Sequence, residues 1–418
     1  MSRRDFLEDF VGTSLWSVVP AKHRFRYRKD SNAGMKESHR LALTMGGVIN
    51  RSLDDTEGLQ SSDYGSYQIF EKGDLAFKLI DLQNIKTSRV GLVPRRGIMS
   101  PAYIRLTPTS DSVYPEFFYW YFYAAYLGNI FNGLGGGIRQ NLSQTELLEF
   151  PVPDIPAEDQ VAISRFLDRE TGLIDGLIEK KTRFIALLNE KEKAAISRFV
   201  RRGLDRNTLT IDSGVDWRGR VPAHWVRGRM KDHFRQEKRQ GYETLTVLSV
   251  YREFGVIEKS SRDDNINKTP EDLTKYQLVK PNDLVINKMK AWQGSMGIAQ
   301  MRGITSPDYV VMRPIGEHDP RYMHHYLRAQ PMPWVYRLIS NGIRTDQWRM
   351  EAEKFLGLPV FMPPIEEQRR IADRIDVELE RIRSLITLTE RSIDLLREKR
   401  SALITAAVTG KIDVRAAA

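Results

Sequence analysis

Residues 160–205 read QVAISRFLDRETGLIDGLIEKKTRFIALLNEKEKAAISRFVRRGLD, and residues 368–413 read QRRIADRIDVELERIRSLITLTERSIDLLREKRSALITAAVTGKID. The two segments align without a gap, and 17 of the 46 aligned positions are identical. Matches continue upstream in the same order, as at Ser100-Pro101 and Ser306-Pro307. The chain is therefore predicted to be a tandem duplication of about half its length. Two copies are too few for a solenoid.

Each repeated segment is predicted to form one long helix that begins near Pro156 or Pro364. Apolar residues recur there at alternating steps of four and three, which is typical of a coiled coil. An alternative is that both helices pack inside a globular core. A length of more than 40 residues favours the coiled coil, because globular helices are usually shorter. The predicted seam comprises Ile163, Leu167, Ile174, Leu177, Leu188, Ile371, Ile375, Ile382, Leu385 and Leu396.

The segments that precede the two helices have a different pattern. Short β-rich runs such as Asp74–Phe77 alternate with Gly, Asp and Pro, and aromatic stretches such as Phe117–Tyr126 follow. The predicted fold class is α/β, with two similar domains, each followed by a long helix, and with the helices pairing as an antiparallel coiled coil about a pseudo-two-fold axis. The predicted boundaries are 1–155 and 221–362 for the domains, 156–204 and 363–412 for the helices, 205–220 for a linker and 413–418 for a tail.

The composition favours a polyanionic partner. The 418 residues carry a net charge of +10, with a pI of about 9.5. Residues 206–356 contain 25 Lys and Arg against 18 Asp and Glu, whereas residues 1–150 contain 18 against 16. The absence of cysteine excludes disulfides, thiolate zinc sites and cysteine nucleophiles. No apolar run approaches membrane-spanning length, and no apolar signal core follows Met1, so a cytoplasmic protein without a membrane partner is expected.

No enzyme motif is found in the sequence. The pattern Gly-x-x-x-x-Gly-Lys-Ser/Thr is absent, and no buried strand leads into the glycine cluster 133–137. The Asn/Asp-Pro-Pro-Tyr/Phe tetrapeptide of amino-methyltransferases is absent as well. His324 and His325 are adjacent, so helical geometry directs them away from a common ligand. We therefore predict no catalytic residue, no metal site and no enzymatic activity for this chain.

Several local motifs resemble the specificity subunits of Type I restriction-modification enzymes. Residues 212–217 (DSGVDW) with 221–225 (VPAHW) resemble the family's entry into its second recognition domain. Residues 287–294 (NKMKAWQG) with 306–309 (SPDY) resemble a recurrent recognition-domain core, and residues 363–368 (PPIEEQ) resemble the start of a spacer helix. The resemblance covers nearly the whole chain but is weaker before residue 60. The first copy has 78–81 (KLID) in place of 287–290 (NKMK) and lacks the Trp-Gln-Gly.

The resemblance implies a function in DNA recognition. It implies that the chain binds a bipartite target in double-stranded DNA and docks two methyltransferase subunits, which methylate adenine, and restriction-translocase subunits. S-adenosylmethionine, ATP and Mg are then expected in those partner subunits, and no cofactor is expected in this chain. A helix of this length would reach on the order of 65 Å, so the helix pair would set the distance between two half-sites.

Polar side chains near the divergent motifs are the candidates for DNA contact, because Arg and Lys suit guanine and Gln and Asn suit adenine. The alternative for each is a surface polar residue without a DNA role. Trp292 is expected in the core. The candidates are Lys78, Gln83, Asn84 and Arg139 in the first domain and Lys288, Lys290, Gln293 and Arg344 in the second.

Two other functions are compatible with these patterns. The chain could be the specificity part of a related restriction system in which nuclease and methylase are fused in another chain. It could also be a coiled-coil scaffold that does not read bases, in which case its DNA binding would not depend on sequence.

Overall fold

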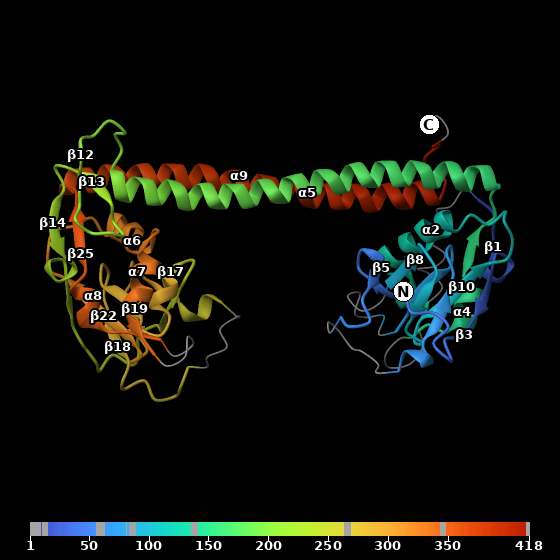
Figure 1. Ribbon diagram of the computed structural model, residues 1–418, viewed down its shortest axis with the longest axis horizontal. Helices are drawn as coiled ribbons and strands as arrows, with labels where there is room; N and C mark the ends of the chain where they lie inside the picture. Colours follow the sequence, from blue (N-terminus) through green and yellow to red (C-terminus); the bar gives the residue numbers. More distant parts are fainter. Residues whose placement is uncertain are drawn as a thin grey trace. The chain divides into compact units, whose positions relative to one another are not determined.

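The computed structural model describes Phe10 and residues 16–55, 63–80, 82, 89–134, 141–262, 269–342 and 348–414. The chain forms two compact units, here called unit 1 (Met1–Thr182 with Glu390–Ala418) and unit 2 (Arg183–Thr389). Each unit combines one globular region with part of each long helix (Figure 1). Within the described ranges, no helix has both the length and the apolar character needed to cross a membrane.

Unit 1 contains a four-stranded sheet in the order β2-β10-β7-β8 and a five-stranded sheet in the order β3-β6-β9-β4-β5, and β1 pairs with β11. The strands are β1 (Val18–Pro20), β2 (Phe25–Arg28), β3 (Asp30–Ser31), β4 (Arg40–Thr44), β5 (Gly47–Arg51), β6 (Gln68–Phe70), β7 (Leu75–Lys78), β8 (Arg89–Leu92), β9 (Gly97–Met99), β10 (Ile104–Pro108) and β11 (Pro151–Pro153). The short helices are η1 (Ala21–His23), η2 (Tyr64–Ser66), α2 (Pro115–Leu127), α3 (Ile130–Leu134) and α4 (Gln144–Leu148).

Unit 2 repeats the four-stranded sheet, here in the order β15-β22-β19-β20, and its other described strands form two-stranded pairs. The strands are β12 (Thr210–Asp212), β13 (Arg220–Pro222), β14 (Val226–Arg229), β15 (Phe234–Gln236), β16 (Leu248–Tyr251), β17 (Gly255–Glu258), β18 (Gln277–Val279), β19 (Leu284–Asn287), β20 (Met296–Ile298), β21 (Gly303–Thr305), β22 (Tyr309–Pro314), β23 (Ser340–Asn341), β24 (Arg349–Met350) and β25 (Pro359–Met362). The short helices are η3 (Met230–Asp232), η4 (Lys259–Ser261), η5 (Ala291–Gln293), α6 (Pro320–Arg328), α7 (Met332–Leu338) and α8 (Ala352–Leu356).

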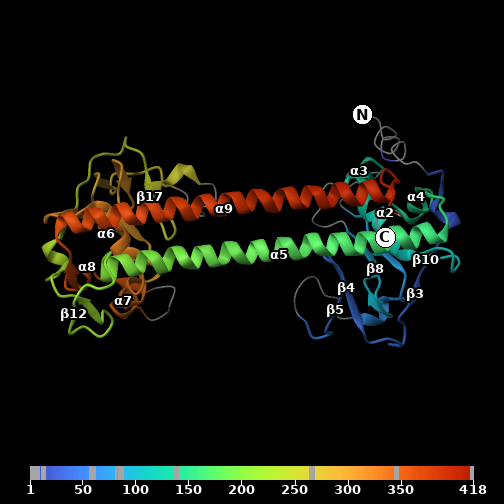
Figure 2. The same ribbon diagram turned by 90° about the horizontal axis from the view of Figure 1, so that it is seen from above.

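The two long helices are α5 (Ala157–Arg202) and α9 (Ile365–Val408), which contain 46 and 44 residues. In unit 1 the first part of α5 packs on the last part of α9, and Arg400 Nε lies 2.9 Å from Asp175 Oδ1. In unit 2 the last part of α5 packs on the first part of α9, and Lys191 Nζ lies 3.6 Å from Glu378 Oε1. The helices therefore run antiparallel and side by side in each unit, as Figure 2 shows.

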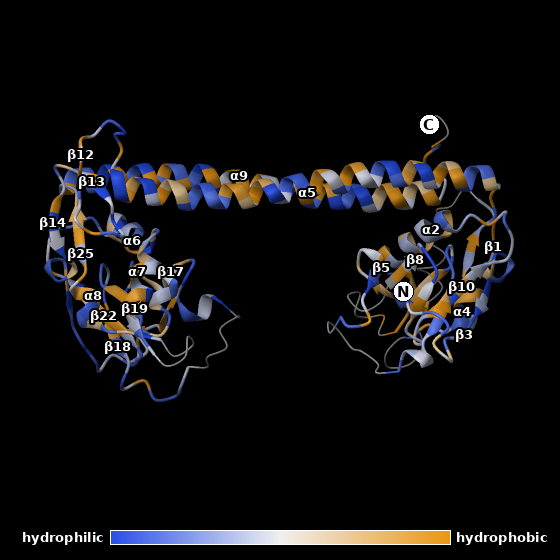
Figure 3. Cartoon of the chain, in the orientation of Figure 1, coloured by the Kyte–Doolittle hydropathy of each residue, from blue (hydrophilic) through white to orange (hydrophobic). Residues whose placement is uncertain are grey.

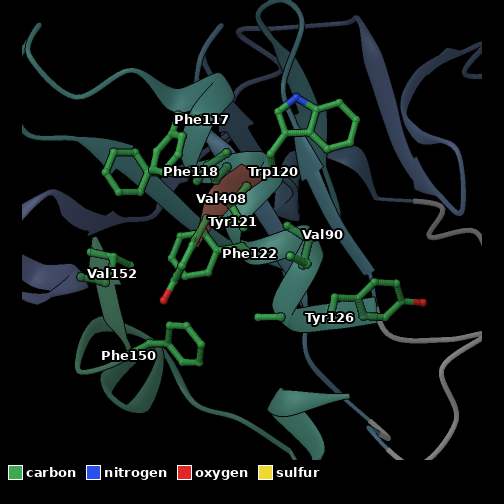
Figure 4. Packing of buried hydrophobic residues seen from close by; sticks show 14 of the residues in the cluster. Val90, Phe117, Phe118, Trp120, Tyr121, Phe122, Tyr126, Phe150, Val152 and Val408 are labelled. Atoms are coloured by element: carbon green, nitrogen blue, oxygen red, sulfur yellow. The ribbon is translucent and has the colours of Figure 1, made fainter. Parts of the chain in front are cut away.

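The core of unit 1 is built around α2, whose sequence PEFFYWYFYAAYL is apolar on nearly every face. A helix of this kind is stable only when it is surrounded. Phe118 meets Phe25 of β2 edge to face at 5.1 Å, and Phe122 meets Phe77 of β7 in the same way. Figure 4 shows Phe118 and Phe122 among the other buried residues of this cluster. The cluster also contains buried residues from both long helices, namely Ile163, Leu167, Ile404, Ala407 and Val408. The domain and the helix ends thus share one core.

The core of unit 2 has the same construction with different residues. The aromatic helix is α6, where Tyr322 and Tyr326 are buried. The buried residues contributed by the long helices are Phe199, Val200, Ile371, Ala372, Ile375 and Leu379. Tyr322 donates its hydroxyl hydrogen to the Val200 carbonyl oxygen at 3.2 Å, so the domain also satisfies a backbone acceptor near the end of α5.

The seam between the helices differs from the predicted one at two equivalent positions. Leu177 is 47% exposed and Leu385 is 37% exposed, so the prediction that they lie in the seam is wrong. The adjacent Ile178 and Ile386 are half-buried instead. Both neighbours are apolar, so a step of three or four fits the sequence equally well. Among the other predicted seam residues, Leu396 is half-buried, and those that are buried are Ile163, Leu167, Ile174, Leu188, Ile371, Ile375 and Ile382.

The choice of seam leaves apolar side chains on the outer faces of both helices. The hydropathy colouring shows apolar residues along α5 and α9 that are not confined to one stripe (Figure 3). The exposed ones are Leu173, Leu177 and Leu395 in unit 1 and Phe184, Leu187, Val377, Leu385 and Leu388 in unit 2.

The adjacent residues Leu187 and Leu188 give a matched test of this seam. Leu188 is 5% exposed and Leu187 is 53% exposed. Leu188→Ala should lower the free energy of unfolding by about 2–5 kcal/mol, because it leaves a cavity between packed helices. Leu187→Ala should change it by about 0.5 kcal/mol or less. Urea denaturation followed by far-UV circular dichroism measures both values, and equal destabilisation by the two variants would contradict the seam.

Candidate nucleic-acid interface

The structure describes four of the eight residues that the sequence predicts to contact DNA. Lys78, Lys288, Lys290 and Gln293 lie in described segments. The other four, Gln83, Asn84, Arg139 and Arg344, lie outside the described residues.

The four-stranded sheet of unit 2 brings three chain segments to one edge. β22 pairs antiparallel with both β15 and β19. The end of β15, the start of β22 and the end of β19 therefore lie at the same edge of the sheet. Asp308 immediately precedes β22 and Lys288 immediately follows β19. Lys238 is the second residue after β15, because Glu237 stands between them. We call this edge, in either unit, the strand-end surface.

Lys288 is held in place on this surface through its backbone and its side chain. Its carbonyl oxygen accepts a hydrogen bond from the Met350 N–H at 3.0 Å, which brings Arg349 of β24 beside it. Its ammonium group donates to the Pro307 carbonyl oxygen at 3.3 Å. Burial lowers the pKa of Lys288, the nearby cation Arg349 lowers it further, and Asp308 opposes the shift. The surface therefore brings the cations Lys238, Lys288 and Arg349 close to the Asp308 carboxylate.

Unit 1 has the same surface with different side chains. β10 pairs antiparallel with β2 and β7, which places Lys29, Ala102 and Leu79 at the positions of Lys238, Asp308 and Lys288. The Leu142 N–H donates to the Leu79 carbonyl oxygen at 3.1 Å, in the same way that the Met350 N–H donates to Lys288.

The strand-end surface of unit 1 contains a pocket with a volume of about 380 Å³. The lining is neutral except for Lys29. Its other residues are Tyr27, Leu79, Ile80, Pro101, Ala102, Tyr103, Ile104, Leu142, Ser143, Gln144 and Thr145.

The remaining described candidates lie close to this surface. Lys78 is the last residue of β7, one position before Leu79, and it is half-buried. Lys290 is exposed and stands immediately before η5. Gln293, the last residue of η5, is half-buried.

Trp292 is half-buried rather than fully enclosed, so the expectation that it lies in the core is met only in part. Its indole N–H donates to the Met289 carbonyl oxygen at 3.1 Å. Its ring meets Trp348 with the centroids 5.7 Å apart, and the Arg337 guanidinium lies over Trp348 at 5.1 Å. An aromatic and cationic face therefore adjoins Arg349.

Four residues of the strand-end surfaces were not among the predicted DNA contacts: Lys29, Lys238, Asp308 and Arg349. Lys29 and Lys238 could have been found, because each follows a similar strand that begins with Phe25 or Phe234. Arg349 could not, since only the hydrogen bond between Met350 and Lys288 brings it to the sheet edge. In the described part of the chain, no three His, Asp or Glu side chains are grouped so as to hold a metal ion.

Comparison with curated proteins finds specificity subunits. The Type I restriction enzyme MjaVIII specificity subunit of Methanocaldococcus jannaschii is 24% identical over 291 residues, which is 65% of this chain and 63% of the relative. The putative MjaX specificity subunit of the same organism is 21% identical over 281 residues, 66% of this chain and 63% of the relative. The matches thus span just under two thirds of these relatives. No protein-family model matches the chain.

Comparison with solved structures finds the same fold. One matching structure, described as showing complex assembly and conformational transition of the type I R-M system, has a TM-score of 0.62 at 14% identity and covers 95% of this chain and 98% of its own. The HsdS subunit from Thermoanaerobacter tengcongensis has a TM-score of 0.53 at 12% identity and covers 95% and 97%. The resemblance to Type I specificity subunits and the predicted fold class, two similar domains each followed by a long helix, are both confirmed.

Lys29 and Lys238 share one position in the two units, so the simplest role for each is a contact with a phosphate group, which carries no sequence information. Lys238→Ala should weaken binding to duplex DNA for every sequence. The slope of the plot of log binding constant against log salt concentration should become shallower by about 1.

A matched control for Lys238→Ala is Lys231→Ala, which removes an exposed lysine before the opposite end of β15. The control should keep the original slope. Fluorescence anisotropy over a salt series measures both variants, and an unchanged slope for Lys238→Ala would remove this lysine from the interface.

Proposed function

We propose that the chain is the non-catalytic specificity subunit of a Type I restriction-modification complex and that each unit reads one half of a bipartite target in double-stranded DNA. The observation that carries this proposal is that the two units share one fold, while the side chains of their strand-end surfaces differ. A duplicated fold places both surfaces in one chain, and their different side chains suit different base sequences. The similarity to two curated specificity subunits and the net charge of +10 support it.

The proposed partners are two methyltransferase subunits, which methylate adenine with S-adenosylmethionine, and restriction-translocase subunits, which use ATP and Mg. The exposed apolar residues of α5 and α9 support docking of partner subunits on the helices, since clustered exposed apolar side chains often mark protein interfaces. The specificity subunit itself contributes binding and orientation. The proposed location is the cytoplasm, where chromosomal DNA would be accessible to the complex.

The long helices have a proposed role in setting the gap between half-sites. Each is one continuous element that begins in one unit and ends in the other, and α-helices are stiff compared with loops. The unread base pairs of a bipartite target would then correspond to the length of helix between the two domains.

Mapping of methylated adenines tests the function directly. Cells that carry this chain with its methyltransferase partner should methylate a split motif with a fixed gap. Cells that carry either protein alone should methylate none, because sequence reading and methyl transfer would reside in different chains. Methylation of a continuous motif, or methylation by the purified chain alone, would refute the proposal.

The spacer role is tested by inserting four residues into each helix, between Glu179 and Lys180 and between Leu395 and Leu396. These sites face each other, because Asp175 pairs with Arg400 and the helices are antiparallel. Four residues add about 6 Å, and a coiled coil accommodates such a stutter by local unwinding. Both half-sites should stay the same, while the gap grows by one or two base pairs at about 3.4 Å each.

The control for the helix insertions is an insertion of four residues between Asp205 and Arg206, in the segment after α5. That change lengthens the chain but neither helix, so the gap should remain unchanged. Methylome sequencing reads the motif for every variant. An active double-insertion variant that keeps the original gap would show that the helices do not set the spacing.

A further inference from the structure

The strand-end surfaces of the two units share one position and differ at three. The shared position is occupied by a lysine in both units, Lys29 in unit 1 and Lys238 in unit 2. At the other positions, unit 1 has Leu79, Ala102 and Asn141 where unit 2 has Lys288, Asp308 and Arg349. The equivalence rests on strand register and on the matching hydrogen bonds donated by Leu142 and Met350. Phosphate contacts can be common to both halves of a target, whereas base contacts must differ wherever the half-sites differ.

The three differing positions in unit 2 supply donors and an acceptor side by side. The Lys288 ammonium has three N–H donors, of which one is directed to the Pro307 carbonyl oxygen. The Arg349 guanidinium adds a planar set of donors, and the Asp308 carboxylate is acceptor-only when ionised. In the major groove, guanine presents the acceptors N7 and O6, and its paired cytosine presents the donor N4. The set in unit 2 therefore matches the major-groove edge of a G·C pair.

We infer that unit 2 reads a G·C base pair through Lys288, Arg349 and Asp308, and that the equivalent surface of unit 1 reads its half-site without charged side chains at these positions. This inference rests on the proposed function. Lys288 and Arg349 donate to N7 and O6 of guanine, and Asp308 accepts from N4 of cytosine. Lys238 positions the DNA backbone beside them, as Lys29 does in unit 1.

The neutral surface of unit 1 requires a different readout. Leu79 and Ala102 leave a hollow instead of two charges, and Ile80 at its rim is 40% exposed. The exposed amide of Gln144 can donate an N–H to adenine N7 while its carbonyl oxygen accepts from N6. The two units thus present different chemistry at one place in the fold, as a target with two unlike halves requires.

The test uses the full chain together with its methyltransferase partner and maps methylated adenines. The variant Lys288→Leu with Arg349→Asn gives unit 2 the residues of unit 1 at the two donor positions and leaves Asp308 in place. One half of the motif should then accept other base pairs at a position where the parent requires G·C, with discrimination reduced about 10- to 100-fold. The other half should stay the same. Lys231→Leu, which removes an exposed lysine of unit 2 away from the strand-end surface, should leave both halves unchanged.

A second variant keeps the test informative if the double variant fails to accumulate. Lys288→Gln replaces the ammonium by an amide of similar reach, and it should move the preference at that position from G·C toward A·T, because Gln matches adenine. Circular dichroism melting confirms that each variant is folded.

Three results would overturn the inference: relaxation at an A·T position, an unchanged motif, or a loss of methylation at all sequences with a shallower salt dependence. The last result would assign Lys288 and Arg349 to phosphate groups. If the parent chain with its partner gives no split motif at all, the proposed function fails. If it gives a split motif in which no G·C pair responds to these variants, only the present inference fails.

Discussion

The packing of the helix ends into the domain cores is the constraint on which the rest of the structure depends. Unit 1 buries Ile163 and Leu167 from the start of α5 together with Ile404 and Val408 from the end of α9, and both pairs contact the aromatic core around α2. The residues of this core are separated by most of the chain. The complete core of unit 1 therefore includes residues from both ends of the sequence. Contacts so distant in sequence are slow to form.

The sequence repeat was sufficient to predict this architecture, because apolar periodicity over more than 40 residues has few structural explanations. It could not resolve which of two adjacent apolar residues enters the seam. Leu177 and Ile178 have similar burial energies, and only the position of the partner helix decides between them. The same ambiguity recurs at Leu385 and Ile386, as expected if the duplicated helices pack by the same rule.

The candidate DNA-binding residues were harder to predict. Lys288 was found because it belongs to a divergent motif, whereas Asp308 and Arg349 join it only through strand pairing and one backbone hydrogen bond. The sequence alone does not show which strand ends lie at the same edge of a sheet. Comparison of the two copies position by position, once the strands are known, separates the shared lysines from the three differing residues.

The two copies also show how chemistry can vary while the core is preserved. Asp74 and Asp283 are buried at equivalent positions before β7 and β19. Asp74 pairs with Arg105 of β10, whereas Asp283 pairs with Arg239, which follows β15. A buried carboxylate must have a cationic or hydrogen-bonding partner, but any neighbouring strand can supply it. Each buried carboxylate thus needs a nearby partner group, but this need does not determine which strand supplies it.

At two of the differing positions of the strand-end surface this requirement is absent. Asp308 and Arg349 are exposed, and exposed substitutions usually change stability by about 0.5 kcal/mol or less, whereas core truncations cost about 2–5 kcal/mol. Side chains at these two positions can therefore differ between the units without disturbing either core, whereas Leu79, at the position of Lys288, is itself part of the core of unit 1. The aromatic helices and the helix ends maintain the position of the sheet edge, and the residues at that edge remain free to match different base pairs. This separation explains physically how one duplicated fold can present two unlike reading surfaces in a single chain.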